Sequence, residues 1–394
     1  MKGQSLVVLC LLTIACFASN WVDGSSSSSR IRSRIKSRIK SRSKSKSTAQ
    51  TKTKVGCYFV LGDSQADNGN NNVMEMAYGN AKADYKPYGC DFNREGTPTG
   101  RFTNGRNTPD FIATYLGFRR YISPFTTIKG REILDGVNYA SGGAGILPET
   151  GRTLGKVLSI HKQLENHNIT ISRIRGLLGT RSATSTHLSS CLYTVQIGSN
   201  DYLNNYFMPK FYKTSAQFTP QQFATLLNNQ LYTDLKVLYE QGARKVAVFG
   251  VGSIGCTPYA RANFENKGGG CVDKINNAIQ LFNDGLKALV RQLNTKMAGA
   301  KFTYIDVFKI SSTSPTTSVA GRMVLNAPCC EVDAGQVQCT PLGRICANRM
   351  EYMFWDAVHP TEVGISALAS RAFKAKEAGD AYPYDINQLV HLPK

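Results

Sequence analysis

The chain has 394 residues, of which 42% are hydrophobic and 10% aromatic, and it carries a net charge of +20. Apolar side chains in this number can form a large core, so the composition excludes a wholly disordered, a collagen-like or a coiled-coil protein. The charge is unevenly placed. Residues 1–54 hold 12 of the 47 Lys and Arg and one of the 27 Asp and Glu, which leaves 35 cations and 26 anions, a net charge of +9, for residues 55–394. The basic excess belongs mainly to a terminal segment, and we expect no nucleic-acid partner.

The first 24 residues have the pattern of a secretory signal peptide. Lys2 precedes an apolar stretch from Leu6 to Ala18, and small and polar residues follow. The stretch has the length of a signal h-region and is too short to span a bilayer as a helix. We predict a signal peptide over residues 1–24, cleaved between positions 18 and 24, and hence an extracellular protein.

Residues 25–54 form a basic tail of low complexity. They begin with five serines, continue through SRIR, SRIK, SRIK and SRSK, and contain eleven cations and no acidic residue. Three isoleucines cannot offset the entropy of ordering this segment, so we predict that it is disordered. Behind an export signal, an acidic polysaccharide or an anionic membrane surface is the natural partner of such a tail. A merely solvated tail and a removed pro-segment remain as alternatives.

Nine cysteines follow the signal segment and indicate disulfides in an exported protein. None forms a CxxC pair, and the late cysteines have no histidine at zinc-ligand spacing, so we expect no metal site. The expected disulfides are Cys256–Cys271 and pairs within the group Cys329, Cys330, Cys339 and Cys346. The odd total leaves one free thiol, whose identity the sequence leaves open. Asn168 opens the sequence's single N-glycosylation sequon, Asn168-Ile169-Thr170.

Short apolar runs alternate with longer helical patterns from residue 55 onward. The strand candidates are residues 57–61, 192–197, 245–249 and 302–307, with a weaker one at 137–140. Their apolar residues are continuous, as in parallel strands that are buried on both faces. A helix is expected over residues 220–241, where Thr219 fits the N-cap and Gln222 completes a capping box, and another over 272–296. This alternation predicts an α/β sheet with ligands at the carboxyl ends of its strands.

Two short segments carry the residue types of a serine nucleophile and its base. Gly62-Asp63-Ser64 directly follows the first predicted strand, where a serine beside a permissive glycine is exposed. Asp356-Ala357-Val358-His359 places a carboxylate three residues before a histidine. A carboxylate in this role fixes the tautomer of the base that deprotonates the serine. Each segment has an ordinary alternative, a helix cap for Ser64 and a structural loop for the other.

Two further segments contain donors that an oxyanion needs. Gly198-Ser199-Asn200-Asp201 follows another apolar strand, and Ala140-Ser141-Gly142-Gly143 offers glycine-flanked N–H groups. An Asn side chain and backbone N–H groups both stabilise a tetrahedral intermediate. Each segment alone is also typical of a turn. Together the four segments predict a serine hydrolase.

A competing motif, Gly250-Val251-Gly252-Ser253-Ile254-Gly255, fits the GxGxxG pattern of dinucleotide-binding proteins. That site requires the last glycines to open a helix, and an acidic residue about 20 residues later at the end of the next strand. Cys256-Thr257-Pro258 interrupts such a helix, and Asp273 begins a helical pattern instead. We therefore expect no dinucleotide and no other cofactor.

The chain resembles the GDSL esterases and lipases of the SGNH hydrolase superfamily, specifically the plant-type branch. The segments that carry the resemblance are FVLGDSQADNGNNN (59–72), GVNYASGGAGI (136–146), VQIGSNDY (195–202), GVGSIGCTP (250–258) and FWDAVHPTE (354–362). The resemblance implies a flavodoxin-like three-layer α/β fold with a mostly parallel, roughly five-stranded sheet, a secreted product and no metal.

By that resemblance, Ser64 is the nucleophile, His359 its base and Asp356 the residue that orients the base, while Gly142 and Asn200 join the Ser64 N–H in the oxyanion hole. We predict a carboxylic ester hydrolase that acts on a small-molecule or lipid ester in the apoplast or cell wall. Ser64 and His359 must meet, so residues 55–394 form one domain. Acyl transfer by the same site is one alternative, and an idle wall- or membrane-binding protein is another. The acyl chain length and the alcohol moiety of the substrate stay open, as does the oligomeric state of the protein.

Overall fold

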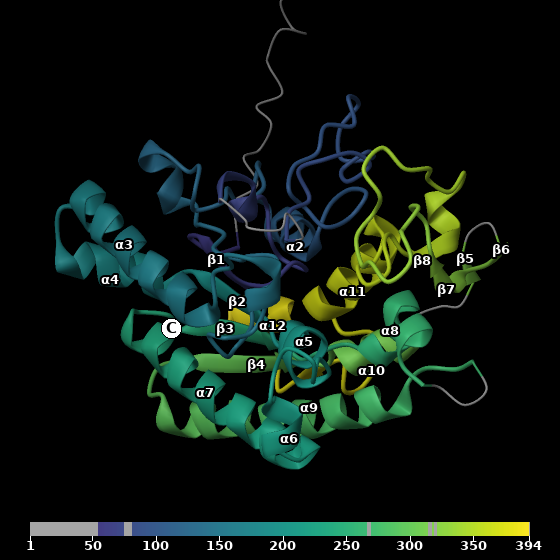
Figure 1. Cartoon of the computed structure of the whole chain (residues 1–394). Helices are drawn as coiled ribbons and strands as arrows, with labels where there is room; N and C mark the ends of the chain where they lie inside the picture. The colour runs from purple at the N-terminus through teal and green to yellow at the C-terminus, as the bar shows by residue number, and fades with distance from the viewer. Residues whose placement is uncertain (1–53, 75–80, 266–268, 314–316, 319–320, 394) are drawn as a thin grey trace, which may run out of the picture. The chain divides into compact units, whose positions relative to one another are not determined.

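A five-stranded sheet forms the middle layer of the computed structural model, which describes residues 54–74, 81–265, 269–313, 317–318 and 321–393 (Figure 1). The predicted signal peptide and the basic tail up to residue 53 lie outside these residues. The sheet order is β1 (Tyr58–Gly62), β2 (Leu192–Gln196), β3 (Lys245–Phe249), β4 (Lys301–Ile305) and β9 (Ala381–Tyr382). The first four strands are parallel and β9 is antiparallel to β4. The prediction of a mostly parallel α/β sheet is confirmed.

A weaker pairing extends the sheet beyond β1. Val60 forms an isolated parallel bridge with Asn138, in the segment predicted as a weak strand. The Val60 N–H donates to the carbonyl of Val137, and the Tyr139 N–H donates to the carbonyl of Val60. With this segment included, the spatial order is 2-1-3-4-5, which is that of flavodoxin-like folds. The full strand does not form, since the Gly62 N–H, which would continue the pairing, donates to Gln163 Oε1 at 2.8 Å instead.

Alternate side chains of each strand point into two separate apolar cores. In β1, Phe59 and Leu61 enter one core, while Tyr58 and Val60 enter the other. A strand buried on both faces therefore needs a continuous apolar run, which explains the sequence pattern. The first core is covered by α3 (Ile160–Leu178), α7 (Pro220–Glu240) and α9 (Asp273–Lys296), and the second by α2 (Thr108–Leu116), α11 (Glu362–Phe373) and α12 (Ile386–His391). The result is a three-layer sandwich.

The helix boundaries follow the capping signals in the sequence. Thr219 caps α7 by accepting a hydrogen bond from the Gln222 N–H, and the Gln222 side chain accepts one from the Thr219 N–H at 2.9 Å. This reciprocal pair satisfies two donors that the first turn would otherwise leave without partners. The four main predicted strands and the two predicted helices agree with the structure to within two residues at each end, and only the weaker strand at 137–140 is not formed.

Shorter elements connect these layers. The shorter helices and helical turns are η1 (Asn70–Val73), η2 (Gly130–Leu134), η3 (Arg152–Leu154), α4 (Arg181–Ser189), α5 (Ser199–Asp201), η4 (Tyr202–Tyr206), α6 (Thr214–Gln217), η5 (Ile254–Cys256), α8 (Pro258–Asn263), α10 (Val307–Thr313) and η6 (Arg349–Glu351). Two small ladders pair β5 (Thr317–Ser318) with β6 (Gly321–Arg322) and β7 (Val324–Pro328) with β8 (Tyr352–Phe354). None of the described helices is long and apolar enough to cross a membrane.

Four disulfides link the described cysteines. Three are of the expected kind: Cys256–Cys271, Cys329–Cys346 and Cys330–Cys339. The fourth, Cys57–Cys191, joins the residues that precede β1 and β2 and was not predicted. Cys90 is the free thiol among the described residues. Among the described residues, Cys57, His187 and Cys191 lie close enough together to be metal ligands. Both of these sulfurs belong to the fourth disulfide.

Candidate active site

Ser64 stands just beyond the carboxyl end of β1. Gly62 ends the strand, and a Cβ atom there would lie 2.5 Å from the Gln196 carbonyl oxygen of β2, so this position requires glycine. The Asp63 N–H then donates to the same carbonyl at 3.1 Å, which turns the chain out of the sheet. Ser64 is left half-buried at the edge of a pocket.

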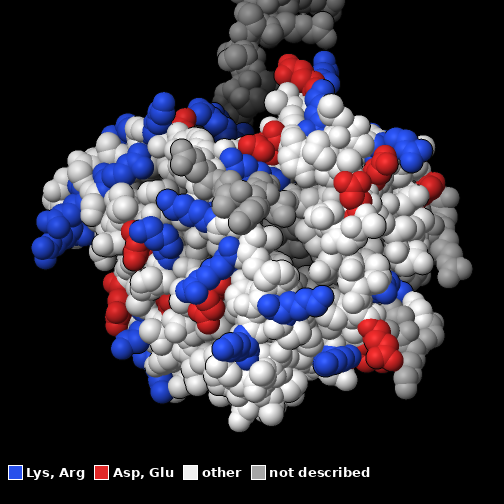
Figure 2. Space-filling view, viewed as in Figure 1, with Lys and Arg blue, Asp and Glu red and all other residues white. Residues whose placement is uncertain are grey.

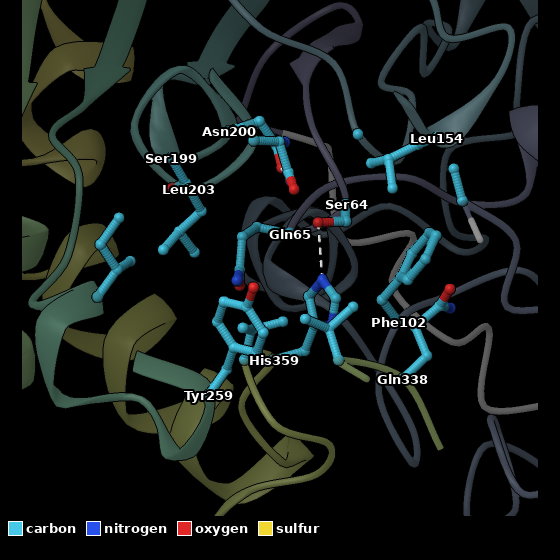
Figure 3. Close-up of a pocket in the computed structure, with 16 residues that line it drawn as sticks. Ser64, Gln65, Phe102, Leu154, Ser199, Asn200, Leu203, Tyr259, Gln338 and His359 are labelled. Atoms are coloured by element: carbon cyan, nitrogen blue, oxygen red, sulfur yellow. Dashed lines mark hydrogen bonds between the residues drawn. The ribbon is translucent and has the colours of Figure 1, made fainter. Parts of the chain in front are cut away.

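His359 and Asp356 reach this position from the loop before α11. The Nε2 atom of His359 lies 2.8 Å from Ser64 Oγ (Figure 3). Its Nδ1 atom lies 2.7 Å from Asp356 Oδ2. Asp356 is fully buried, and its Oδ1 accepts the N–H groups of Val358 at 2.9 Å and His359 at 2.7 Å. With its Nδ1 proton held by the carboxylate, the imidazole presents Nε2 as an acceptor to the serine hydroxyl.

Asn200 approaches Ser64 from the start of α5, at the carboxyl end of β2 (Figure 3). Its Nδ2 donates to the Ala144 carbonyl at 2.9 Å, and its Oδ1 accepts from Asn204 Nδ2 at 2.6 Å. These two bonds fix the orientation of the amide plane. An amide nitrogen carries two protons, so one N–H remains available in the pocket that Asn200 and Ser64 both line.

The N–H of Gly142, which we expected in the oxyanion hole, is bonded to another residue. This N–H donates to Asp67 Oδ2 at 2.9 Å, and the fully buried Asp67 carboxylate also accepts the N–H groups of Gly69 and Asn70. The glycine that lines the pocket is Gly143, whose φ of 80° strongly favours glycine. Within the described chain, the N–H groups of Ser64 and Gly143 have no hydrogen-bond acceptor.

A polar network behind Ser64 holds the Ser141–Gly143 turn. Asn71 Nδ2 donates to the Gly142 carbonyl at 2.9 Å, and Asn71 Oδ1 accepts from Ser141 Oγ at 2.6 Å. Asn70 Nδ2 donates to the Ala140 carbonyl at 2.8 Å. No role was predicted for this polar run. The row of Asp and Asn residues that follows Ser64 could have indicated this network, because buried amide side chains need hydrogen-bond partners and nearby backbone groups provide them.

The pocket around Ser64 combines an apolar wall with few polar groups. The apolar side chains are Phe102, Leu154, Leu203, Ile254, Tyr259, Val337 and Val358, and the polar neighbours include Gln65, Ser199, Asn204 and Gln338. The cavity measures about 70 Å³, so it has room only for the part of a bound molecule that lies next to Ser64. Residues 250–255 do not open a dinucleotide-binding helix: η5 is a single turn, and it brings Ile254 to the pocket.

Comparison with known proteins places the chain in a family. The model of the GDSL-like lipase/acylhydrolase family matches residues 58–372. The chain belongs to this family. One GDSL esterase/lipase of Arabidopsis thaliana is 48% identical over 347 residues, covering 87% of this chain and 94% of its own. Another from the same plant is 47% identical over 339 residues, covering 85% and 92%. This GDSL protein is accordingly a carboxylic ester hydrolase.

Solved structures also match, at lower similarity. The phospholipase A1 of Streptomyces albidoflavus NA297 has 16% sequence identity and a TM-score of 0.31, and the match covers 79% of this chain and 95% of that one.

Asp63, beside Ser64, gives a prediction about stability. Burial raises the pKa of its carboxyl from 3.8 to about 7, and Oδ2 has no hydrogen-bond partner. The folded protein therefore favours the neutral carboxyl. The stability that the neutral Asp63 carboxyl provides is complete below pH ~4, and it is lost as the pH rises to about 7 and the carboxyl ionises. Asp63→Asn, which mimics the neutral form, should raise the free energy of unfolding at pH 8, by at most ~4 kcal/mol, and change little at pH 4.

Thermal unfolding at the two pH values measures this difference. Asp284→Asn, at an exposed position of α9, is the matched control and should give equal small shifts at both. An Asp63→Asn variant that is destabilised equally at pH 4 and pH 8 would contradict the prediction.

Proposed function

We propose that this esterase cleaves acyl esters through an acyl-enzyme on Ser64. The observation that carries the proposal is the hydrogen-bonded line from Ser64 Oγ through the His359 imidazole to the buried Asp356 carboxylate, at 2.8 and 2.7 Å. His359 Nε2 takes the hydroxyl proton as Ser64 Oγ attacks the ester carbonyl. The resulting imidazolium is stabilised by Asp356 and returns the proton to the leaving alcohol. Water, deprotonated by the same imidazole, then releases the acid and restores Ser64.

The oxyanion of each tetrahedral intermediate needs donors on the other side of Ser64. We assign this role to the N–H groups of Ser64 and Gly143 and to the second N–H of Asn200. This assignment replaces Gly142 with its neighbour, because the Gly142 N–H is held by Asp67. In a pocket with an apolar wall, such preorganised donors stabilise the developing charge more than water does.

A serine-reactive phosphonate tests this proposal. We expect one phosphonate per chain, attached to the peptide that contains Ser64, and complete loss of esterase activity. Ser64→Ala should remain unlabelled. Ser199→Ala removes another serine of the same pocket and is the matched control, which should label as the unchanged protein does. Labelling that persists in Ser64→Ala would refute the assignment.

We further propose that the protein acts outside the cell. Four disulfides are typical of proteins that fold in oxidising compartments. The predicted signal peptide supports the same location. Asn168 of the sequon is exposed on α3, while Thr170 is buried and donates to the Asn166 carbonyl, so a glycan would be added before this helix forms.

The basic tail provides a separate prediction about retention. On the face shown in Figure 2, basic and acidic side chains are interspersed over the folded body. The tail carries eleven cations without an acid. Deleting residues 25–54 behind a retained signal peptide should lower the salt concentration at which the protein elutes from polygalacturonate and leave ester turnover unchanged. Elution at the same salt concentration with and without the tail would show that the tail has no binding role.

A further inference from the structure

Tyr88 contacts the catalytic carboxylate from a side that the substrate does not reach. Its side chain is fully buried, in a cluster with Phe102 and Trp355, and it is absent from the residues lining the pocket. Its hydroxyl donates to Asp356 Oδ2 at 2.6 Å. The same oxygen faces His359 Nδ1 at 2.7 Å. One carboxylate oxygen is thus shared by the base and the phenol.

The direction of the Tyr88 hydrogen bond follows from its other partner. The Cys339 N–H donates to the Tyr88 oxygen at 3.2 Å, so the single phenol proton is left for Asp356. Burial, followed by the charge of Asp356, raises the pKa of Tyr88 well above 10, and the phenol stays neutral during turnover. The Asp356 carboxylate therefore has a full set of donors: two N–H groups on Oδ1, and Tyr88 and His359 on Oδ2.

We propose that Tyr88 is a positioning residue of the active site, whose hydroxyl holds Asp356 in place and limits how strongly this carboxylate retains the proton of His359. The proposal rests on the proposed roles of Ser64, His359 and Asp356. A donor to Oδ2 withdraws negative charge from the oxygen that stabilises the imidazolium. Without it, His359 holds its proton more tightly, and the free base appears only at higher pH.

Other ionisable groups also face this pair. Ser64 contacts Nε2 of His359, the charge of His359 acts on the Asp63 carboxyl, and Tyr85 interacts with the charge of Asp356. Tyr85 packs edge-to-face on Tyr88 with ring centroids 5.2 Å apart, and its hydroxyl donates to the Cys339 carbonyl at 2.9 Å. It shares the surroundings of Tyr88 without bonding to Asp356, so it offers a matched control.

The test compares Tyr88→Phe with Tyr85→Phe in the full chain. The readout is the pH profile of kcat/KM on a chromogenic ester, with rates divided by the number of phosphonate-titrated sites. For Tyr88→Phe we expect kcat to fall about 10-fold, KM to stay within about twofold, and the acid limb to move up by about half to one pH unit. Tyr85→Phe should leave the acid limb in place. An unmoved limb in Tyr88→Phe, or equal shifts in both variants, would overturn the proposal.

A second substitution keeps the test decisive if Tyr88→Phe folds poorly. Replacing Tyr88 with 3-fluorotyrosine retains the ring and the hydroxyl and makes the phenol a stronger donor. The acid limb should then move to lower pH, opposite to the shift in Tyr88→Phe. A limb that stays in place, or moves upward, counts against the proposal. Phosphonate labelling of Ser64 in each variant separates a failure of this proposal from a failure of the proposed nucleophile.

Discussion

Ser64→Ala should lower kcat by about 10⁶-fold, to the residual rate that binding and oxyanion donors alone support. The reason lies in the geometry: His359 Nε2 is 2.8 Å from Ser64 Oγ, and an alanine leaves it no nucleophile to activate. His359→Ala should cost about as much, because the serine and its base act as one unit. Their combination should then add almost nothing to either single loss. Steady-state hydrolysis of a short-chain chromogenic ester measures all three variants.

The control for this series is again Ser199→Ala, which should retain most of its activity. Circular dichroism and thermal unfolding should show that Ser64→Ala folds, since Ser64 is only half-buried. Residual activity of Ser64→Ala at a tenth of the original rate would mean that another residue attacks the ester, and the proposed acyl-enzyme would be wrong.

Asn200→Ala should lower kcat by about 10²- to 10³-fold with a small change in KM, since the lost donor acts on a charge that develops only in the transition state. The amide is held for this task by Ala144 and by Asn204. Asn204→Ala frees one side of the amide and keeps the donor, so its loss should be below about 10-fold. Kinetics of both variants on one ester make the comparison. Equal losses in kcat would show that Asn200 acts through packing and not as an oxyanion donor.

The strands and the long helices could be predicted because their signals are local. Residues 245–249 form a continuous apolar run, and β3 has the same bounds. The capping box of Thr219 and Gln222 marks the start of α7, and its two residues lie close together in the sequence. The weak strand at 137–140 was harder, because its pairing with β1 is limited to a single bridge and the Gly62 N–H donates to the Gln163 side chain, 101 residues away.

The site was predictable where short motifs carry it and less so where distant segments meet. Ser64, His359 and Asp356 come from two compact motifs, and the structure brings them into hydrogen-bonding distance. The choice between Gly142 and Gly143 depends on which N–H the buried Asp67 carboxylate captures, a contact across 75 residues. Tyr88 meets Asp356 across 268 residues, with no local signal at either end.

The most direct test of the central claim is to trap the acyl-enzyme. Rapid mixing with excess chromogenic ester, acid quenching within milliseconds and mass analysis of the digested chain would locate any covalent acyl group. We predict a burst of alcohol approaching one equivalent per active site, with the acyl mass on the peptide that carries Ser64. Alcohol release with no covalent acyl group, or an acyl group on any residue other than Ser64, would contradict the mechanism.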